Sequence, residues 1–291
     1  MDFKEAYKQK LLEVFDFTVQ FLDDHNLQWW AAYGTCIGAV RHQGLIPWDD
    51  DIDLYMLRKD YMILISLRDE LQKRGYDILD AHNGLNSMFF LKISDQHTTL
   101  VSEKEEPLDV GVYIDVFPLD YCDGDVIQFD KDYMEIKKWL GFFKYTFFKI
   151  SLNDIIQSIK RKDGRTAQFI YSMVAPKCMK DWSKRKIEKI EKRISRHVKD
   201  CYLASYFGAY RKKEIYNAEW FDGYEVLSYE GRSIRLPLHY DDYLRHIYGD
   251  YMTPPAIIPE STHCQYYVNL KQKISLDEVK ERIKKRITKE F

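Results

Sequence analysis

The spacing of hydrophobic positions indicates one helix at the start of the chain, mainly strands between about residues 27 and 117, and mainly helices in the middle of the chain. Apolar side chains recur every three or four residues between Phe3 and Leu22, which predicts an amphipathic first helix. The same reasoning predicts helices over 35–42 and 60–73, and strands over 27–33, 51–57, 76–80, 88–93, 98–101 and 111–117. From Val126 to Lys199 the pattern is mostly helical.

The last part of the chain mixes both periods. Short strands are expected around 225–227 and 233–236, followed by helices near 241–248 and over 276–287. Ser275, with Glu278 three residues later, has the spacing of a capping box at the start of that last helix. Strands followed by helices, rather than regular alternation, indicate an α+β fold with a mixed sheet.

Composition narrows the class of protein. The 291 residues have a net charge of −2, which argues against a dedicated nucleic-acid binder. The chain has no apolar run of transmembrane length and no signal-like start, so a cytoplasmic location is expected. The five widely spaced cysteines fit reduced thiols.

The small net charge hides an asymmetry along the sequence. Residues 1–130 contain 11 basic and 25 acidic side chains, whereas residues 131–200 contain 19 basic and 8 acidic ones. The acidic part is suited to cations and the basic part to anions, although the two parts can also simply attract each other.

Candidate chemistry is concentrated in the segment Ile46–Met56, whose sequence is IPWDDDIDLYM. Asp51 and Asp53 are two residues apart on a predicted strand, so both point to one face while Ile52 and Leu54 point to the other. Two carboxylates side by side form a site for a hard cation, and Mg²⁺ is the expected ion with Mn²⁺ as the alternative. A calcium-binding EF-hand loop fits poorly, because Leu54 stands where such a loop needs glycine.

The corner Gly34-Thr35 joins a buried strand to the start of a helix. Backbone N–H groups and the helix dipole at such a corner favour a phosphate group. Arg41 can add a forked contact to a phosphate, or it can instead satisfy the end of its own helix.

Asp115 lies inside the apolar strand segment Val112–Pro118. A buried carboxylate without a partner is costly, so Asp115 is expected to face a metal or another cation. If its strand lies beside residues 51–57, Asp115 completes a triad with Asp51 and Asp53. It can then bind a cation or accept the proton of an attacking hydroxyl.

Together, the Gly34-Thr35 corner, the GAVRH run from Gly38, the IPWDDDIDL segment and the IDVFPLD segment from Ile114 resemble the LicD family of phosphocholine transferases. The stretch Tyr243–Tyr251 is similar to that family's C-terminal signature, whereas Pro254-Pro255-Ala256 departs from its ending. The resemblance implies a nucleotidyltransferase-like fold, shared with fukutin-type ribitol-phosphate transferases. It implies a catalytic core over 1–125, a basic helical section over 126–215 and a C-terminal region over 216–291 that packs back on the core.

The same resemblance implies the site and the reaction. Asp51, Asp53 and Asp115 would be the metal-binding and catalytic residues, and Gly34 and Thr35 would hold the donor phosphates. The donor would be CDP-choline or another CDP-alcohol, and the acceptor a sugar hydroxyl of a cell-surface glycan or glycolipid, with CMP released. Nucleotidyl transfer from an NTP, a DxD-type glycosyltransferase and an inactive binding module are the alternatives.

The segment Lys137–Lys149 interleaves lysines with aromatic side chains. This composition suits a glycolipid groove or peripheral contact with the inner face of the cell membrane, but it also suits a core helix with solvated lysines.

Overall fold

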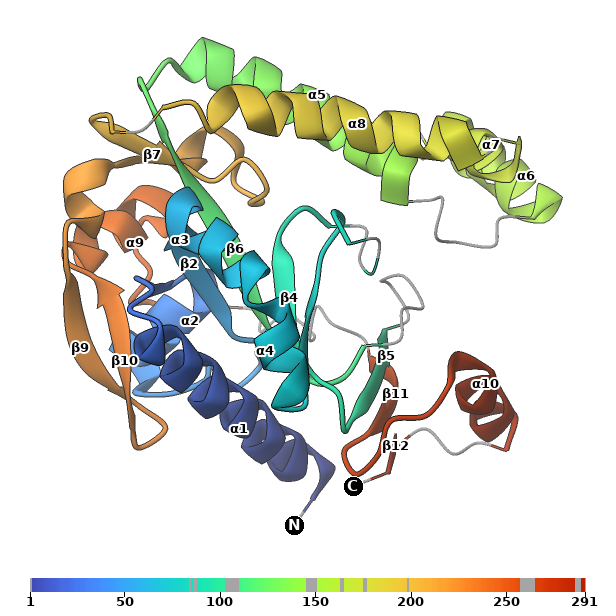
Figure 1. Ribbon diagram of the computed structural model, residues 1–291, viewed down its shortest axis with the longest axis horizontal. Helices are drawn as coiled ribbons and strands as arrows, with labels where there is room; N and C mark the ends of the chain where they lie inside the picture. The colour runs from blue at the N-terminus through green and yellow to red at the C-terminus, as the bar shows by residue number, and fades with distance from the viewer. Residues whose placement is uncertain are drawn as a thin grey trace.

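A seven-stranded mixed sheet forms the centre of the fold (Figure 1). The computed structural model describes residues 2–83, 85, 88–102, 110–144, 151–162, 165–174, 177–197, 199–256, 265–285 and 289–290. The strands run in the order β1-β2-β6-β4-β3, and β7 and β8 extend the sheet beyond the far end of β6. Their bounds are β1 (Trp30–Ala31), β2 (Asp53–Leu57), β3 (Tyr76–Leu79), β4 (Leu91–Asp95), β6 (Tyr113–Cys122), β7 (Tyr202–Ala204) and β8 (Ile215–Asn217).

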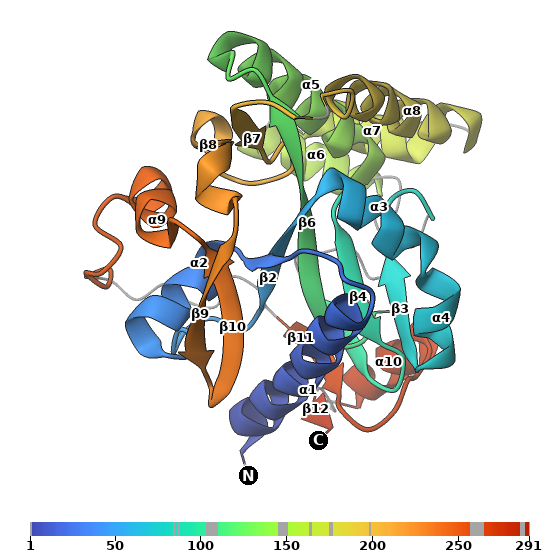
Figure 2. The same ribbon diagram turned by 60° about the vertical axis from the view of Figure 1, so that its left-hand side comes forward.

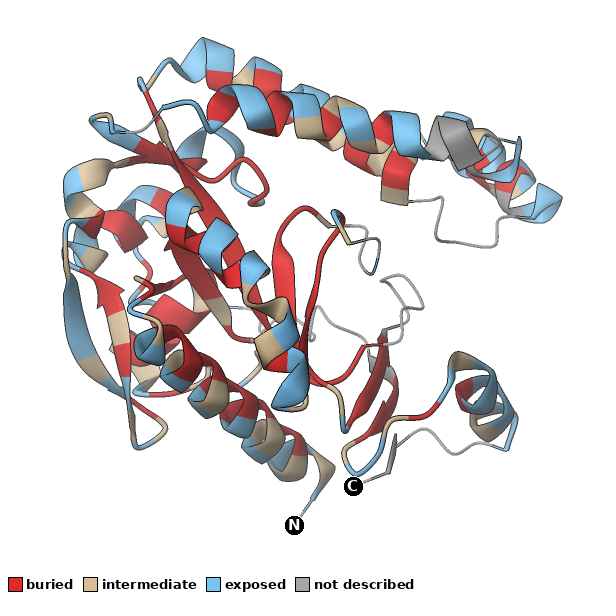
Figure 3. Cartoon of the chain, viewed as in Figure 1, coloured by how far each residue is buried: buried red, intermediate tan, exposed pale blue. Residues whose placement is uncertain are grey.

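The long strand β6 organises the sheet because it pairs with three others. It runs parallel to β2 and antiparallel to β4, and its last residues pair with β7. Nearly every residue of β6 is buried, as the colouring of the sheet in Figure 3 shows. A strand covered on both faces reads as a continuous apolar run, which explains the composition of this segment.

The first helix, α1 (Phe3–Asp24), crosses the sheet in front of β6 and β4 (Figure 2). Its N-cap is Asp2, whose side chain accepts a hydrogen bond from the backbone N–H of Glu5. Its apolar stripe, which includes Leu11 and Phe15, is completely buried. The predicted first helix is therefore confirmed.

The helix after β1 differs from its prediction. The buried segment predicted as a strand over 27–33 pairs only at Trp30–Ala31, and α2 (Tyr33–Ile37) begins directly after it. A π-helical turn, η1 (Gly38–His42), continues α2, and Gln43 ends it in the left-handed conformation with φ of 54°. The predicted helix over 60–73 is two helices, α3 (Arg58–Ser66) and α4 (Arg68–Lys73), which meet at Leu67.

The helical middle of the chain is confirmed. Its helices are α5 (Val126–Lys144), α6 (Leu152–Arg161), α7 (Thr166–Val174) and α8 (Lys177–Ile194). The long helices α5 and α8 pack side by side above the sheet, and α6 and α7 lie toward one end of this pair (Figure 1).

The C-terminal part returns to the sheet. The hairpin β9 (Tyr224–Tyr229) and β10 (Arg232–Pro237) turns through Glu230 and Gly231, both with positive φ, as a two-residue hairpin requires. The helix α9 (Tyr240–Tyr248) packs against α2, and a small sheet joins β5 (Thr99–Ser102), β11 (Gln265–Asn269) and β12 (Lys289–Glu290). Ser275 caps α10 (Leu276–Lys284) by accepting from the N–H of Glu278, as its spacing predicted.

The α+β class with a mixed sheet core is thus confirmed. The proposed division at residues 125 and 215 stays a prediction. Strand β7, which lies within the section 126–215, pairs with β6 of the first section.

Candidate functional site

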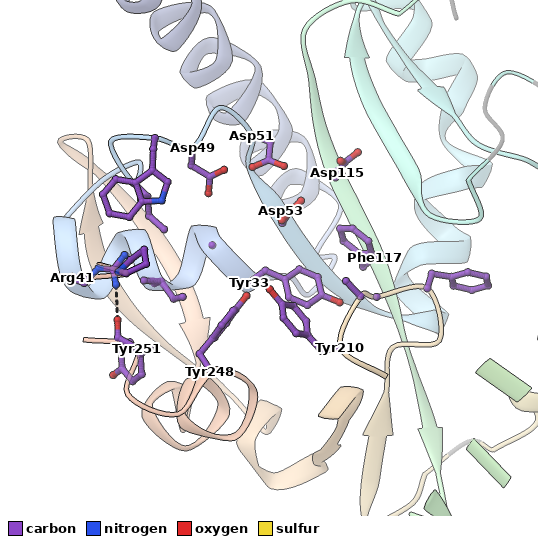
Figure 4. Close-up of a pocket in the computed structure, with 18 of the residues that line it drawn as sticks. Tyr33, Arg41, Asp49, Asp51, Asp53, Asp115, Phe117, Tyr210, Tyr248 and Tyr251 are labelled. Carbon is purple, nitrogen blue, oxygen red and sulfur yellow. Dashed lines mark hydrogen bonds between the residues drawn. The ribbon is translucent and has the colours of Figure 1, made fainter. Parts of the chain in front are cut away.

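Strands β2 and β6 bring three predicted aspartates together. The two strands pair in parallel with Asp53 directly opposite Asp115, and Asp51 precedes Asp53 by two residues. One carboxylate oxygen from each of the three side chains lies within 4.8 Å of the others. Figure 4 shows the three carboxylates grouped at one side of a pocket. The predicted convergence of Asp51, Asp53 and Asp115 is therefore what the fold produces.

Alternation along β2 explains this arrangement. Ile52 and Leu54 are completely buried on the opposite face, so the two aspartates must face the pocket. Asp115 is held in register because its N–H donates to the carbonyl of Ile52 across 3.0 Å.

The side chain of Thr35 contacts the first residue of β2. Its hydroxyl accepts a hydrogen bond of 2.8 Å from the backbone N–H of Asp53, and its side chain is buried outside the lining of the pocket. The hydroxyl of Thr35 therefore positions Asp53 rather than facing a ligand. A phosphate contact by Thr35 stays a prediction for its backbone N–H alone.

Lys92 is the main site residue that the sequence reasoning missed. It lies on β4 directly opposite Asp115, and its Nζ is 2.8 and 3.1 Å from the two oxygens of Asp115. The ammonium also lies 3.6 Å from the centre of the Tyr113 ring, and the side chain is buried. Asp115 thus has the cationic partner that its burial required. A lysine inside the apolar strand LKISD was the signal that could have revealed it.

The carboxylates strongly influence one another. Burial raises the pKa of Asp53 well above its usual range, and the charges of Asp51, Asp115 and Asp49 raise it further, while Lys92 lowers it. Five carboxylates line the pocket, whereas the cationic side chains beside it are those of Arg41, Lys137 and the ion-paired Lys92, so negative charge remains in excess. Clustered oxygen ligands with this excess fit a divalent cation such as Mg²⁺.

The pocket beside the carboxylates has a volume of about 700 Å³. Gly34 lines it, and a Cβ there would lie 2.6 Å from Oδ2 of Asp49, so glycine permits the close approach of this carboxylate. Arg41 also lines it, which places two of the three residues predicted to bind phosphate at the pocket surface.

Arg41 connects two distant parts of the chain. Its guanidinium donates a hydrogen bond of 2.6 Å to the carbonyl of Tyr251, in the loop after α9, as the dashed line in Figure 4 marks. The same guanidinium lies over the ring of Trp48 at 5.8 Å. The cation thereby joins the end of η1 to the C-terminal stretch that resembles the family signature.

Several other lining residues come from the section 126–215, where the sequence showed little. Lys137 on α5 reaches the pocket edge, with its Nζ 3.5 Å from the carbonyl of Phe207, and burial lowers its pKa. Tyr210 lines the pocket as well. Within the segment 137–149, residues 145–149 lie outside the described part of the chain.

Comparison with known proteins identifies the family. The nucleotidyltransferase domain of the LicD/FKTN/FKRP proteins matches residues 26–155, the stretch that holds Gly34, Asp51, Asp53, Lys92 and Asp115. Residues 26–155 thus form a LicD-family domain. The predicted nucleotidyltransferase-like fold is therefore confirmed.

Among the relatives of this chain is the lipopolysaccharide cholinephosphotransferase LicD of Haemophilus influenzae. The two are 24% identical over 261 residues, which cover 87% of this chain and 92% of that protein. An uncharacterised protein of Rickettsia typhi is 31% identical over 104 residues, covering 36% of this chain and 32% of that protein. One of Rickettsia prowazekii is 38% identical over 61 residues, covering 21% and 23%.

The length and apolar character of the helices bear on whether any of them could span a membrane. Within the described ranges, none combines the length and the apolar character needed to cross a membrane.

Proposed function

We propose that this LicD-family phosphotransferase transfers phosphocholine from CDP-choline to a sugar hydroxyl of a cell-surface glycan or glycolipid precursor, with release of CMP. The observation that carries the proposal is the convergence of Asp51, Asp53 and Asp115 beside a pocket large enough for a nucleotide-linked donor. The relative whose name specifies cholinephosphate transfer to lipopolysaccharide supports the choice of substituent and acceptor class.

In this proposal Asp51, Asp53 and Asp115 hold Mg²⁺, with Mn²⁺ as the alternative. When bound, the ion would offset the charge of the donor diphosphate and of the departing CMP. Gly34 lines the wall of the pocket that would hold the donor, and Arg41 presents its guanidinium to a phosphate oxygen.

The acceptor hydroxyl forms the new bond to the phosphorus that bears choline, and the bond from that phosphorus to the CMP oxygen breaks. Asp115 is the proposed acceptor of the hydroxyl proton, and its contacts of 2.8 and 3.1 Å with Nζ of Lys92 fix the position of its carboxylate. A strong base is not needed, because phosphoryl transfer of this kind depends mainly on positioning and charge stabilisation.

The test is product analysis with isotopically labelled donors. The protein is incubated with Mg²⁺, a glycan acceptor and either choline-labelled CDP-choline, an NTP or a sugar nucleotide. Labelled glycan with CMP supports the proposal, whereas pyrophosphate from the NTP indicates nucleotidyl transfer. Glycosyl transfer from the sugar nucleotide indicates a DxD-type glycosyltransferase, and an inactive binding module gives no product with any donor.

Two substitutions test the site. Asp51→Asn and Asp53→Asn are expected to lower turnover by at least a thousandfold, because each removes a ligand of the proposed ion. Asp50→Asn is the matched control, since Asp50 is adjacent and acidic but neither lines the pocket nor belongs to the cluster. Full activity in both Asp51→Asn and Asp53→Asn would contradict the mechanism.

Peripheral membrane contact is part of the same proposal, and α6 and α7 supply its surface. The helix α6 exposes apolar side chains next to Lys160 and Arg161, a composition typical of helices that lie in a membrane interface, and α7 adds exposed apolar side chains but has no basic residue. The exposed apolar residues are Leu152, Ile156, Ile159, Ile170, Met173 and Val174. Flotation with anionic liposomes at low salt is expected to carry the protein upward, and Ile156→Asp is expected to reduce this. A protein that stays at the bottom at low salt would exclude the contact.

A further inference from the structure

Aromatic rings cover one side of the pocket. In Figure 4, Tyr33, Phe117 and Tyr210 lie below the carboxylates of Asp53 and Asp115. We call these three rings the aromatic floor. The centre of the Tyr33 ring is 5.3 Å from that of Phe117 and 5.8 Å from that of Tyr210, so the three form one continuous surface.

The floor adjoins the carboxylates. Asp49, Asp53 and Tyr210 line the same pocket, and Figure 4 shows the ring of Tyr210 below the carboxylate of Asp53. Phe117 follows Asp115 by two residues on β6, so their side chains share one face of the strand. A ligand group that rests on these rings is therefore a near neighbour of the acidic cluster.

Tyr33 is held in a costly conformation. Its φ of 43° lies in the left-handed region, which bulky residues rarely adopt. Such strain persists only where the surroundings enforce it, and it is concentrated at functional positions. The N–H of Tyr33 donates to the hydroxyl of Tyr243 on α9 across 2.9 Å, which fixes this conformation.

A buried glutamate anchors two of the rings. Glu214, completely buried, accepts a hydrogen bond of 2.9 Å from the hydroxyl of Tyr33 and another of 2.9 Å from the backbone N–H of Tyr210. A Cβ on Gly208 would strike both Glu214 and the hydroxyl of Tyr33, so the packing around this anchor is tight. The floor is thus preformed.

The chemistry of this surface selects a particular ligand group. Faces of aromatic rings attract cations, and a quaternary ammonium needs no hydrogen-bond acceptor. A neutral polyol would instead lose hydrogen bonds to water against these rings without replacing them. Nearby carboxylates add a long-range attraction for positive charge and none for a neutral group.

The size of choline fits the same position. Its nitrogen is separated from the phosphorus by four bonds of about 1.5 Å each, so the two atoms lie only about 5 Å apart. A choline group whose phosphorus is held at the acidic cluster must therefore bind directly beside that cluster, where the floor lies.

We infer that the aromatic floor binds the quaternary ammonium group of the donor alcohol and thereby makes the enzyme selective for choline. This inference rests on the proposed function, because it assigns a subsite of the same pocket. The competing occupant is the cytosine base, which also stacks on aromatic rings.

Direct binding separates these possibilities without turnover. Isothermal titration with choline and with its uncharged isostere 3,3-dimethylbutan-1-ol is compared in the wild type, Tyr210→Phe and Tyr210→Leu. The wild type is expected to bind choline at least tenfold more tightly than the isostere. Tyr210→Leu is expected to lose about tenfold in choline affinity, and Tyr210→Phe to retain it. Tyr210 is partly exposed and bonds to Glu214 only through its backbone, so both variants should fold.

Equal affinity for choline and the isostere would overturn the inference, and so would unchanged choline affinity in Tyr210→Leu. A titration with CMP tests the competing occupant, since a loss of CMP affinity in Tyr210→Leu without a loss for choline assigns the floor to the base and overturns the inference.

Transfer assays separate this inference from the proposed function. If the wild type transfers phosphocholine and Tyr210→Leu has an unchanged KM for CDP-choline, the inference alone fails. If the wild type binds choline as expected but transfers none, the proposed function alone fails.

Discussion

The mutual repulsion of the site carboxylates makes a prediction about stability as well as activity. Replacing Asp53 by Asn removes one charge from the cluster while leaving the backbone N–H that Thr35 receives. In the metal-free protein this substitution should stabilise the fold, although it should also abolish turnover. A site whose carboxylates repel one another until a cation binds should show these opposite effects on stability and turnover.

The magnitude follows from the geometry. Two unit charges at the 4.8 Å limit of the cluster repel by about 3.5 kcal/mol at an effective dielectric constant of 20. Asp53 has two such neighbours, Asp51 and Asp115, but Lys92 offsets the second, and solvent screens a half-buried group. We therefore expect Asp53→Asn to raise the free energy of unfolding by about 2 kcal/mol, which raises Tm by about 4 °C for a chain of this size.

The stability that Asp53→Asn gains over the wild type should depend on pH. Because the pKa of Asp53 is raised in the folded protein, the unfolded chain releases this proton first as pH increases. The wild type therefore loses stability as pH rises from the ordinary range of an aspartate through the raised value. Asp53→Asn lacks this loss, so the difference in Tm between the two should widen as pH rises over that interval.

Thermal melts with and without Mg²⁺ provide the assay. Without metal, Asp53→Asn should melt above the wild type, and Asp50→Asn should match the wild type. Adding Mg²⁺ should raise the Tm of the wild type and of Asp50→Asn, because a ligand that binds only the folded state stabilises it. A metal-free Asp53→Asn protein that melts below the wild type at neutral pH would refute the reasoning.

Three other substitutions test neighbouring parts of the site. Lys92→Met removes the ammonium group from the buried Asp115 and is expected to lower the free energy of unfolding, measured in urea, by about 3–5 kcal/mol. Adding Asp115→Asn to this variant should restore most of the lost stability but none of the activity. Gly208→Ala forces a Cβ against the buried Glu214 and should destabilise the fold by about 1–3 kcal/mol, measured in the same way; an unaffected midpoint would show that the anchor is not tightly packed. Arg41→Gln should raise the KM for the donor about tenfold or more if its guanidinium contacts a phosphate, and initial-rate kinetics with an unchanged KM would exclude that contact.

Local pattern was enough to predict much of the fold and the two carboxylates of β2. The alternation of Asp51, Ile52, Asp53 and Leu54 assigns each side chain to a face, because the side-chain period of a strand is two whatever its neighbours are. The helix α1 and the mostly helical character of the section that contains α5 and α8 followed from helical periodicity, and the capping box at Ser275 from four residues of sequence.

Boundaries were less accurate where tertiary contacts compete with local preference. Residues 27–33 read as a strand, yet only Trp30 and Ala31 pair, because Tyr33 turns into α2 with its N–H bound to the distant Tyr243. The break at Leu67 between α3 and α4 has no proline or glycine to reveal it.

The sequence by itself determined that the protein has an acidic strand with paired carboxylates, a buried aspartate in need of a cation and a chain order typical of an α+β fold. Only the tertiary structure decided that Lys92 is that cation, since the register of β4 against β6 depends on pairing between distant segments. It also decided that Tyr210 lines the pocket and that the buried Glu214 anchors Tyr33, although both residues are more than 150 positions from Tyr33 in the sequence. Side-chain direction along a strand or helix is a local property of the backbone, whereas the meeting of two elements is fixed by the packing of the whole core.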